Sequence, residues 1–223
     1  MKRWTLAGKS EAGSLMLDRL NALSDGVIAV VITLLVLGID VPQDHHFSTE
    51  GFFSFLHKIE YQVVVYAIAF ALTATYWLQH NAMFHYFRHG SRRLIWLNMG
   101  FLFFLTLVPF VTEMIGTYRY EPLVIIVFAA VNVACGLSLA AIWWYANRVE
   151  PVVWPKIDPD VVRSMTLRIL TGPVICLAAV AVSFLNVRLG HAVFLTIPLV
   201  YASHRRVDAH WPEIVEAGGE EDN

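Results

Sequence analysis

Six apolar stretches, each close to the length of a membrane crossing, constrain the fold of this 223-residue chain more than any other feature. A hydrocarbon core of about 30 Å needs roughly 20 helical residues, and the stretches lie at approximately 20–40, 60–83, 94–116, 122–147, 165–186 and 189–204. In lipid each backbone amide must be satisfied within its own segment, and the stretches lack the short alternation of barrel strands. The chain is therefore predicted to be an all-α, polytopic membrane protein with six transmembrane helices.

Composition agrees with a membrane protein and argues against a nucleic-acid partner. Hydrophobic residues make up 57% of the chain and charged residues only 15%. The 16 basic and 18 acidic side chains nearly balance, whereas a nucleic-acid binder carries a large basic excess. The lipid bilayer is the expected partner.

The positions of lysine and arginine predict the orientation, because cytoplasmic loops are enriched in these residues. Only Lys58, Arg119 and Arg188 fall on one side of the predicted spans, and the other thirteen fall opposite. Both termini are therefore predicted to be cytoplasmic, in a multi-pass protein of the cell membrane. Residues 1–206 are predicted to form the six-helix transmembrane domain, and 207–223 an acidic, disordered tail.

Polar residues inside the apolar spans are expensive to bury and are functional candidates by default. Asp25 lies six residues after Arg19, so the two side chains do not stack on one helix face. Other polar groups of the first three spans lie at a similar depth and can donate or accept hydrogen bonds. The residues predicted to form an interhelical polar network are Arg19, Ser24, Asp25, Trp77, His80 and Asn98. Such a network can lock the helices, take part in gating, or do both.

The apolar part of the first span carries a stripe of helical spacing. Val30, Leu34 and Leu37 recur at i, i+4 and i+7, with Thr33 beside them. Spacing alone is explained by ordinary packing against lipid or protein. Small residues at Gly26 and Ala29 allow neighbouring helices to approach closely.

Histidines at the end of the second span raise the question of a metal site. His80, His85 and His89 resemble one of the histidine boxes of membrane desaturases, but the other histidines do not supply further boxes at matching spacing. No His-Glu-x-x-His, Gly-x-Ser-x-Gly or phosphate-binding glycine loop is present. We expect no enzyme activity, no metal and no cofactor.

A motif in the first span resembles a known family. The segment Arg19-x-x-x-Leu23-Ser24-Asp25-x-x-x-Ala29 is similar to the Arg-x-x-x-Phe-Ser-Asp-x-x-x-Ala motif of the lysosomal transmembrane protein 175 potassium channels and their prokaryotic relatives. Further support comes from Trp77-x-x-His80 and from Asn98 followed by Pro109.

This resemblance implies a homotetrameric, potassium-permeable cation channel whose first helix lines the pore. It places the hydrophobic constriction at Val30, five residues after Asp25, with further apolar layers at Leu34 and Leu37. Thr33 matches the position whose hydroxyl is implicated in preferring potassium. Animal relatives carry two copies of the unit per chain, so a single six-helix copy would need four subunits. The permeant potassium ion is then the only small species required.

Two departures from the family pattern stand out. Leu23 replaces the motif phenylalanine, which could alter the packing around Ser24, and Val30 is shorter than the isoleucine or leucine associated with that site. A wider constriction and weaker selectivity would follow. No Thr-Val-Gly-Tyr-Gly filter occurs, so a carbonyl filter built from that loop is not the selectivity device.

Two other classes of function compete with the channel. A proton-coupled secondary transporter could use Asp25 and His80 as a proton relay, since buried Asp and His residues serve this role in transporters. Clearly discontinuous helices and an inverted repeat, which would favour a transporter, are not evident in the sequence. A structural membrane protein without transport is the remaining alternative.

Overall fold

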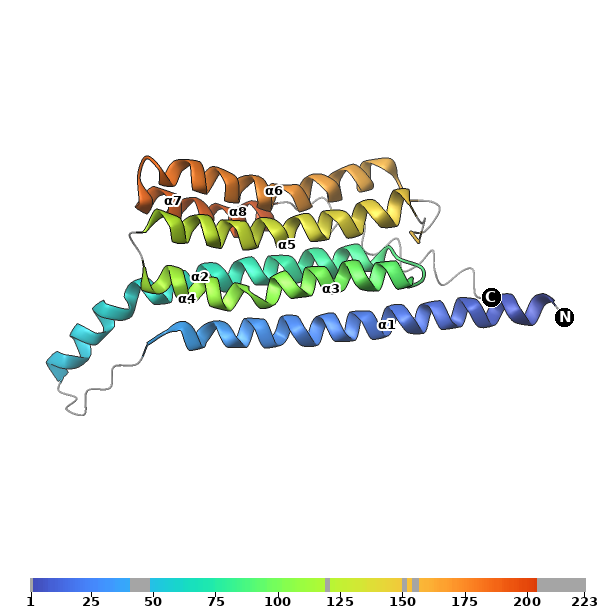
Figure 1. Cartoon of the computed structure of the whole chain (residues 1–223), viewed down its shortest axis with the longest axis horizontal. Helices are drawn as coiled ribbons and strands as arrows, with labels where there is room; N and C mark the ends of the chain where they lie inside the picture. Colours follow the sequence, from blue (N-terminus) through green and yellow to red (C-terminus); the bar gives the residue numbers. More distant parts are fainter. Residues whose placement is uncertain (1, 41–48, 119–120, 150–151, 154–156, 204–223) are drawn as a thin grey trace.

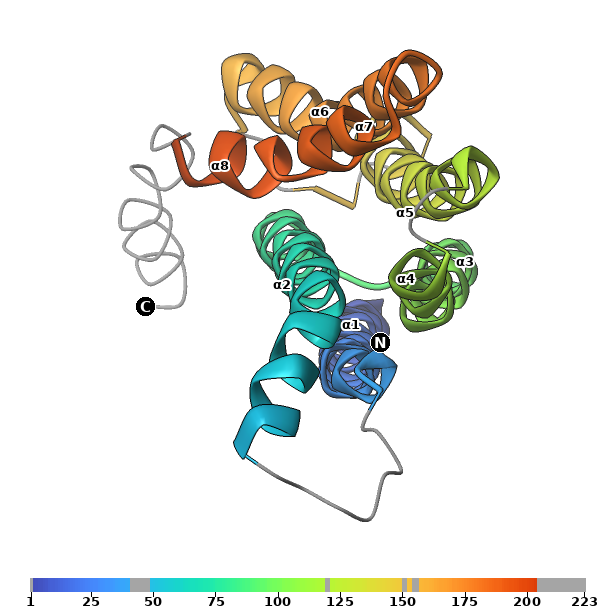
Figure 2. The ribbon, with the colours of Figure 1, turned by 90° about the vertical axis from the view of Figure 1, so that its left-hand side faces the viewer.

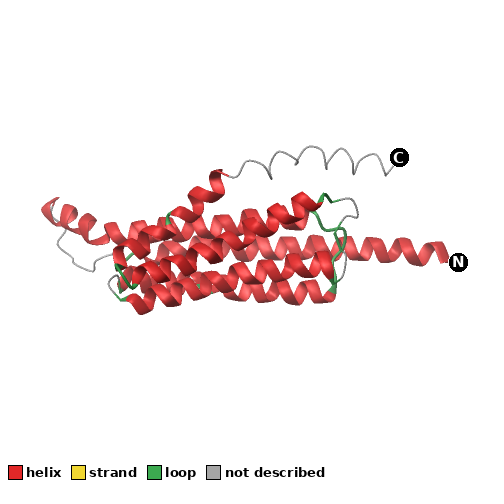
Figure 3. Cartoon of the chain, turned by 90° about the horizontal axis from the view of Figure 1, so that it is seen from above, coloured by secondary structure: helices red, strands yellow, loops and turns green. Residues whose placement is uncertain are grey.

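The protein is an elongated bundle of helices that run side by side along its long axis (Figures 1 and 3). The computed structural model describes residues 2–40, 49–118, 121–149, 152–153 and 157–203, without the side chains of 2–12, 49–51, 58 and 202–203. The described helices are α1 Lys2–Leu34, the 3-10 helix η1 Leu35–Gly38, α2 Thr49–His85, α3 Arg92–Thr106, α4 Val108–Thr117, α5 Pro122–Arg148, α6 Pro159–Ser183, α7 Val187–Phe194 and α8 Thr196–Ser203. The predicted tail, 207–223, lies outside the described residues.

Within the described residues, five helical segments are long and apolar enough to cross a membrane. They are Gly13–Gly38, Ile59–His85, Arg92–Thr117, Pro122–Arg148 and Pro159–Ser183. Each overlaps one of the first five predicted spans, so the prediction of an all-α, multi-pass membrane protein is confirmed.

The sixth predicted span, 189–204, has a different form. It consists of α7 and α8, which are separated at Leu195. Together Val187–Tyr201 rises only ~22 Å at 1.5 Å per residue, which is short of the hydrocarbon thickness of about 30 Å. A sixth crossing therefore stays a prediction.

The arrangement of the bundle leaves α1 at one side. Viewed along the long axis, α1 packs between α2 and the α3–α4 pair, whereas α5 to α8 lie on the far side of those helices (Figure 2). The α1 side chains that face the bundle recur every three or four residues, as one face of a helix requires. They are Leu17, Leu20, Ser24, Ile28, Val31 and, at the start of η1, Leu35.

Local chemistry explains where several helices begin and break. The side-chain oxygen of Ser91 accepts from the backbone N–H of Leu94 and caps α3. Pro109 lacks the N–H that a continuous helix would donate four residues back, and the third span is divided at Leu107, between α3 and α4. Asn186 caps α7 through the backbone N–H groups of Arg188 and Leu189.

A glycine allows α5 and α6 to approach closely. A Cβ added to Gly136 would lie 2.5 Å from Cγ and 2.8 Å from Cδ of Pro173, which stands inside α6. The two helices therefore meet over a bare backbone, as small residues permit in membranes. This contact makes α5 and α6 one wall of the bundle.

Backbone hydrogen bonds tie the connection between α2 and α3 to the N-terminal end of the first span and to the connection after α5. The N–H of Gly90 donates to the carbonyl of Gly13 at 2.9 Å, and the N–H of Arg88 donates to the carbonyl of Val152 at 2.7 Å. Phe87 and Val153 form an antiparallel β-bridge beside them. The turn between α2 and α3 is thus held at both sides.

Candidate functional site

The four residues predicted to line a pore lie together on a face of the first span that no described part of the chain covers. Val30 is 56% exposed, Leu34 43% and Leu37 74%, and Thr33 is also exposed. Ile28 on the opposite face is 1% exposed. We call the uncovered side of α1 and η1, which carries these four residues, the free face.

The side chain of Thr33 is fixed by its own helix. Its Oγ1 donates to the carbonyl of Val30 at 2.8 Å. The hydroxyl hydrogen is therefore used inside the helix, and the remaining acceptor capacity of the oxygen is left on the free face. Such an oxygen can accept from water or face a cation, but its hydrogen is already engaged.

Leu37 has a different backbone from the rest of the stripe. It lies in η1, because the α-helix ends at Leu34 and a 3-10 turn follows. A 3-10 turn has three residues per turn rather than 3.6. The angular position of Leu37 is therefore not the one that the i, i+4, i+7 spacing of an α-helix predicts, although the side chain is still exposed.

Three of the predicted network residues form one buried chain of hydrogen bonds across three helices. The Oγ of Ser24 donates to the carbonyl of Leu20 at 2.8 Å, and Nδ2 of Asn98 donates to that Oγ at 2.8 Å. Nε2 of His80 lies 2.9 Å from Oδ1 of Asn98. Since the Asn98 oxygen can only accept, Nε2 of His80 carries the hydrogen.

These hydrogen bonds are buried, so losing one would leave a polar group without a partner. Ser24 and Asn98 are fully buried and His80 is 2% exposed. The imidazole of His80 stacks on Phe84, with centroids 4.0 Å apart, and on Phe101 at 5.6 Å. Aromatic rings on either side leave little freedom for the imidazole, so α1, α2 and α3 are held at one depth.

Asp25 and Trp77 form a separate pair at the surface. Nε1 of Trp77 donates to Oδ1 of Asp25 at 2.9 Å, Asp25 is exposed, and Trp77 is 38% exposed. The hydrogen bond of Asp25 thus goes to Trp77 and that of His80 to Asn98. The proton relay expected of a transporter would need a direct link between Asp25 and His80, and in the described part of the chain each side chain bonds another residue instead.

Arg19 and Leu23 both lie on the exposed side of α1. Arg19 is exposed and takes no part in the hydrogen bonds of the other five network residues, as far as the described side chains extend. Leu23 is 48% exposed, next to the buried Ser24. The residue that departs from the motif therefore points outward and not into the packing around Ser24.

The sequence did not single out two polar links deeper in the bundle. The hydroxyl of Tyr76 donates to the carbonyl and to Oδ1 of Asn132, which joins α2 to α5. Nε1 of Trp143 donates to Oγ1 of Thr166 at 3.1 Å, which joins α5 to α6. Asn132 is a buried amide in the most apolar span, and that alone was a signal for an interhelical partner.

The histidines show no metal site in the part of the chain that the structure describes. No group of three His, Cys, Asp or Glu side chains there could hold a metal ion. His80 uses Nε2 for Asn98 and is enclosed by two phenylalanine rings.

The part of the chain that carries the free face and the buried hydrogen bonds is similar to a known family. The family model of the endosomal/lysosomal potassium channel TMEM175 matches residues 19–109, a range that contains every predicted site residue. A potassium channel of Streptomyces collinus is 29% identical over 190 residues, which cover 82% of this chain and 90% of that protein. The chain is thus similar to the TMEM175 channels, most clearly over its first three spans.

Solved structures agree with the TMEM175 relationship. The crystal structure of a lysosomal potassium-selective channel TMEM175 homolog from Chamaesiphon minutus superposes with a TM-score of 0.70 at 28% identity. The match covers 84% of this chain and 96% of that one. The human endosomal/lysosomal proton channel TMEM175 is 24% identical, and the match covers 88% of this chain but 42% of the human protein.

The family that matches residues 19–109 is described as a potassium channel. The matched range ends at Pro109. The similarity of α5 to α8 to known channels is therefore supported only by the longer sequence match and by the structural superposition.

Proposed function

We propose that this TMEM175 relative is a potassium-permeable cation channel, in which α1 of each subunit of a homotetramer lines a passive pore. The observation that carries the proposal is the free face, where Val30, Thr33 and Leu34 stand exposed on the same helix as the exposed, charged Arg19 and Asp25. Support also comes from the relatives in Streptomyces collinus and Chamaesiphon minutus, which are named as potassium channels.

The charges on α1 argue that its exposed side does not face lipid throughout. A charged side chain toward the centre of a bilayer costs at least about 2.5–3.5 kcal/mol on insertion scales. Asp25 accepts a hydrogen bond from Trp77 and remains exposed. Water in a pore or a neighbouring subunit would remove most of this cost, and copies of the chain arranged around an axis would supply both.

The apolar residues of the free face would form the gate. Four Val30 side chains around an axis would make a hydrophobic constriction that closes by losing its water, with apolar layers at Leu34 and Leu37. Thr33 lies within the same stretch, and its oxygen keeps acceptor capacity for a cation that has lost part of its hydration. Potassium preference is assigned to this hydroxyl.

The buried chain of Ser24, Asn98 and His80 would orient α1. Its hydrogen bonds hold the inner face of α1 against α2 and α3, and the free face consequently turns away from the subunit body. A polar lock of this kind serves the pore without touching the ion.

The proposed setting is the cell membrane, with both termini in the cytoplasm. Thirteen of the sixteen lysine and arginine residues fall on the side of the termini, in agreement with the positive-inside rule. The channel domain proposed on this basis is 1–206.

Flux measurements on the purified protein in liposomes test the proposal. Val30→Ala should raise potassium conductance because the constriction widens, and Thr33→Val should lower the preference for potassium over sodium. Val174→Ala on α6 is the matched control, since Val174 is 62% exposed but lies away from the free face. Unchanged currents and ion ratios in both α1 variants would refute a pore lined by α1. Strict coupling of transport to a proton gradient would favour the transporter instead.

A further inference from the structure

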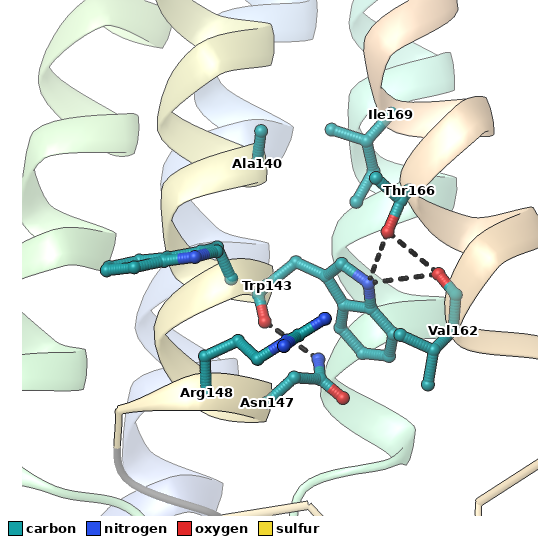
Figure 4. Close-up of a pocket in the computed structure, with 8 residues that line it drawn as sticks. Ala140, Trp143, Asn147, Arg148, Val162, Thr166 and Ile169 are labelled. Atoms are coloured by element: carbon teal, nitrogen blue, oxygen red, sulfur yellow. Dashed lines mark hydrogen bonds between the residues drawn. The ribbon is translucent and has the colours of Figure 1, made fainter. Parts of the chain in front are cut away.

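A cleft between α5 and α6 lies apart from the free face and its buried hydrogen bonds. It encloses about 180 Å³ at the C-terminal end of α5 (Figure 4). Arg148 is the last residue of α5 and of the fourth membrane span, so the cleft opens at a membrane surface. The basic residues place this surface on the cytoplasmic side.

The two walls of the cleft follow from helical spacing. Ala140, Trp144 and Arg148 recur every four residues and form one wall on α5. Val162, Thr166 and Ile169 form the facing wall on α6. From Ala140 to Arg148 the cleft rises ~12 Å, and it passes from an apolar end inside the membrane to a charged end at its surface.

Two polar groups of the cleft can bind a ligand: Oδ1 of Asn147 and the guanidinium of Arg148. Nε1 of Trp143 donates to Oγ1 of Thr166 and to the carbonyl of Val162 at 3.4 Å, so the indole N–H is already bonded to α6. Nδ2 of Asn147 donates to the carbonyl of Trp143 at 2.7 Å, which leaves Oδ1 of Asn147 as an acceptor. Arg148 is exposed, and its guanidinium lies beside Asn147 in Figure 4.

We propose that this cleft binds the headgroup of an anionic phospholipid of the cytoplasmic leaflet, namely phosphatidylglycerol. The guanidinium of Arg148 pairs with the phosphate, since arginine matches phosphate geometry with two parallel donors. A headgroup hydroxyl donates to Oδ1 of Asn147. One acyl chain runs along the apolar wall toward Ala140, beside Trp144, a residue type enriched at membrane interfaces.

The change from an apolar end to a charged end suits a lipid better than a soluble anion. Basic pockets between transmembrane helices on the cytoplasmic side recognise anionic headgroups, and the apolar end of this cleft accommodates a chain that inorganic phosphate lacks. Arg148 also sits favourably at a helix C-terminus whatever it binds. The test therefore has to measure lipid preference and not stability alone.

Native mass spectrometry of the purified full-length protein tests the proposal. The protein is incubated with equal amounts of phosphatidylglycerol and phosphatidylcholine, and wild type should retain phosphatidylglycerol preferentially. Arg148→Gln should lower phosphatidylglycerol occupancy about tenfold, the effect of losing one charge-assisted hydrogen-bonded pair. The matched control is Arg163→Gln, an exposed arginine on α6 that does not line the cleft. It should leave the occupancy unchanged.

A second variant keeps the charge and fills the apolar end. Ala140→Leu should also lower retention of phosphatidylglycerol while Arg148 is intact. Equal retention of the two lipids by wild type would overturn the proposal, as would equal losses in Arg148→Gln and Arg163→Gln, or full retention by both Arg148→Gln and Ala140→Leu. Displacement of the lipid by inorganic phosphate would identify a site for free anions and overturn the lipid assignment.

Discussion

Replacement of Asn98 by alanine tests the proposed lock most sharply, because the Asn98 amide bonds both neighbouring helices. The substitution removes the donor to Ser24 and the acceptor for His80. Interhelical hydrogen bonds in membranes contribute about 0.6 kcal/mol on average and up to about 1.7 kcal/mol. His80 would also keep a buried N–H without a partner, at about 1–3 kcal/mol. We expect the free energy of unfolding to fall by about 2–4 kcal/mol.

A double-mutant cycle isolates the bond between α1 and α3. Ser24→Ala, Asn98→Ala and the double variant are unfolded by denaturant titration in mixed micelles, and a coupling energy of about 0.5–2 kcal/mol is expected. The control is Ser138→Ala. Ser138 donates to the carbonyl four residues back at 2.7 Å, as Ser24 does at 2.8 Å. Among the described residues, the Ser138 hydroxyl makes no hydrogen bond to another helix.

Additive effects in this cycle, or a loss below about 0.5 kcal/mol for Asn98→Ala, would refute the reasoning. A loss for Ser138→Ala as large as that for Ser24→Ala would show that removal of the back-bonded hydroxyl, and not the interhelical bond, is responsible.

Two further substitutions test other contacts. Gly136→Ala should lower the free energy of unfolding by about 1–3 kcal/mol, because its Cβ would meet the rigid ring of Pro173 at 2.5 Å. Thermal unfolding in detergent measures this loss. The control is Gly100→Ala, which has open space around the added Cβ and should not destabilise the protein. Trp77→Phe removes the donor to Asp25 and should cost about 1 kcal/mol in the same assay, since the pair is partly exposed.

The control for the second substitution is Trp96→Phe on α3. Trp96 is 68% exposed, and its indole makes no hydrogen bond within the part of the chain that is described. Equal effects of Trp77→Phe and Trp96→Phe would mean that loss of indole surface, and not the bond to Asp25, determines the stability. Likewise, wild-type stability of Gly136→Ala would contradict the close approach of α5 and α6.

The helices could be predicted from the sequence because hydropathy and length alone decide them. Five predicted spans overlap the five membrane-length helices, and the polar residues of the first three spans pointed to the partners Ser24, His80 and Asn98. In lipid a buried amide or imidazole needs an internal partner, so its residue type indicates its environment.

The remaining features depend on three-dimensional packing. Both faces of α1 are apolar, and hydropathy therefore cannot distinguish the buried Ile28 from the exposed Val30. The separation of Asp25 from the buried chain follows from the position of Trp77 on α2, which no spacing within α1 reveals. The division of the last segment at Leu195 differs, because it lies three residues before Pro198, which has no N–H to donate to the carbonyl of Phe194.

Cysteine accessibility in conducting channels measures the central claim most directly. Val30→Cys is reconstituted in a planar bilayer and exposed to a positively charged methanethiosulfonate reagent; the native Cys135 and Cys176 are fully buried. Val174→Cys on α6 is the control, an exposed position away from the free face. If α1 lines a water-filled pore, the reagent blocks potassium current through Val30→Cys and leaves Val174→Cys unchanged. Potassium current that persists after Val30→Cys is shown by mass to be modified would contradict the account.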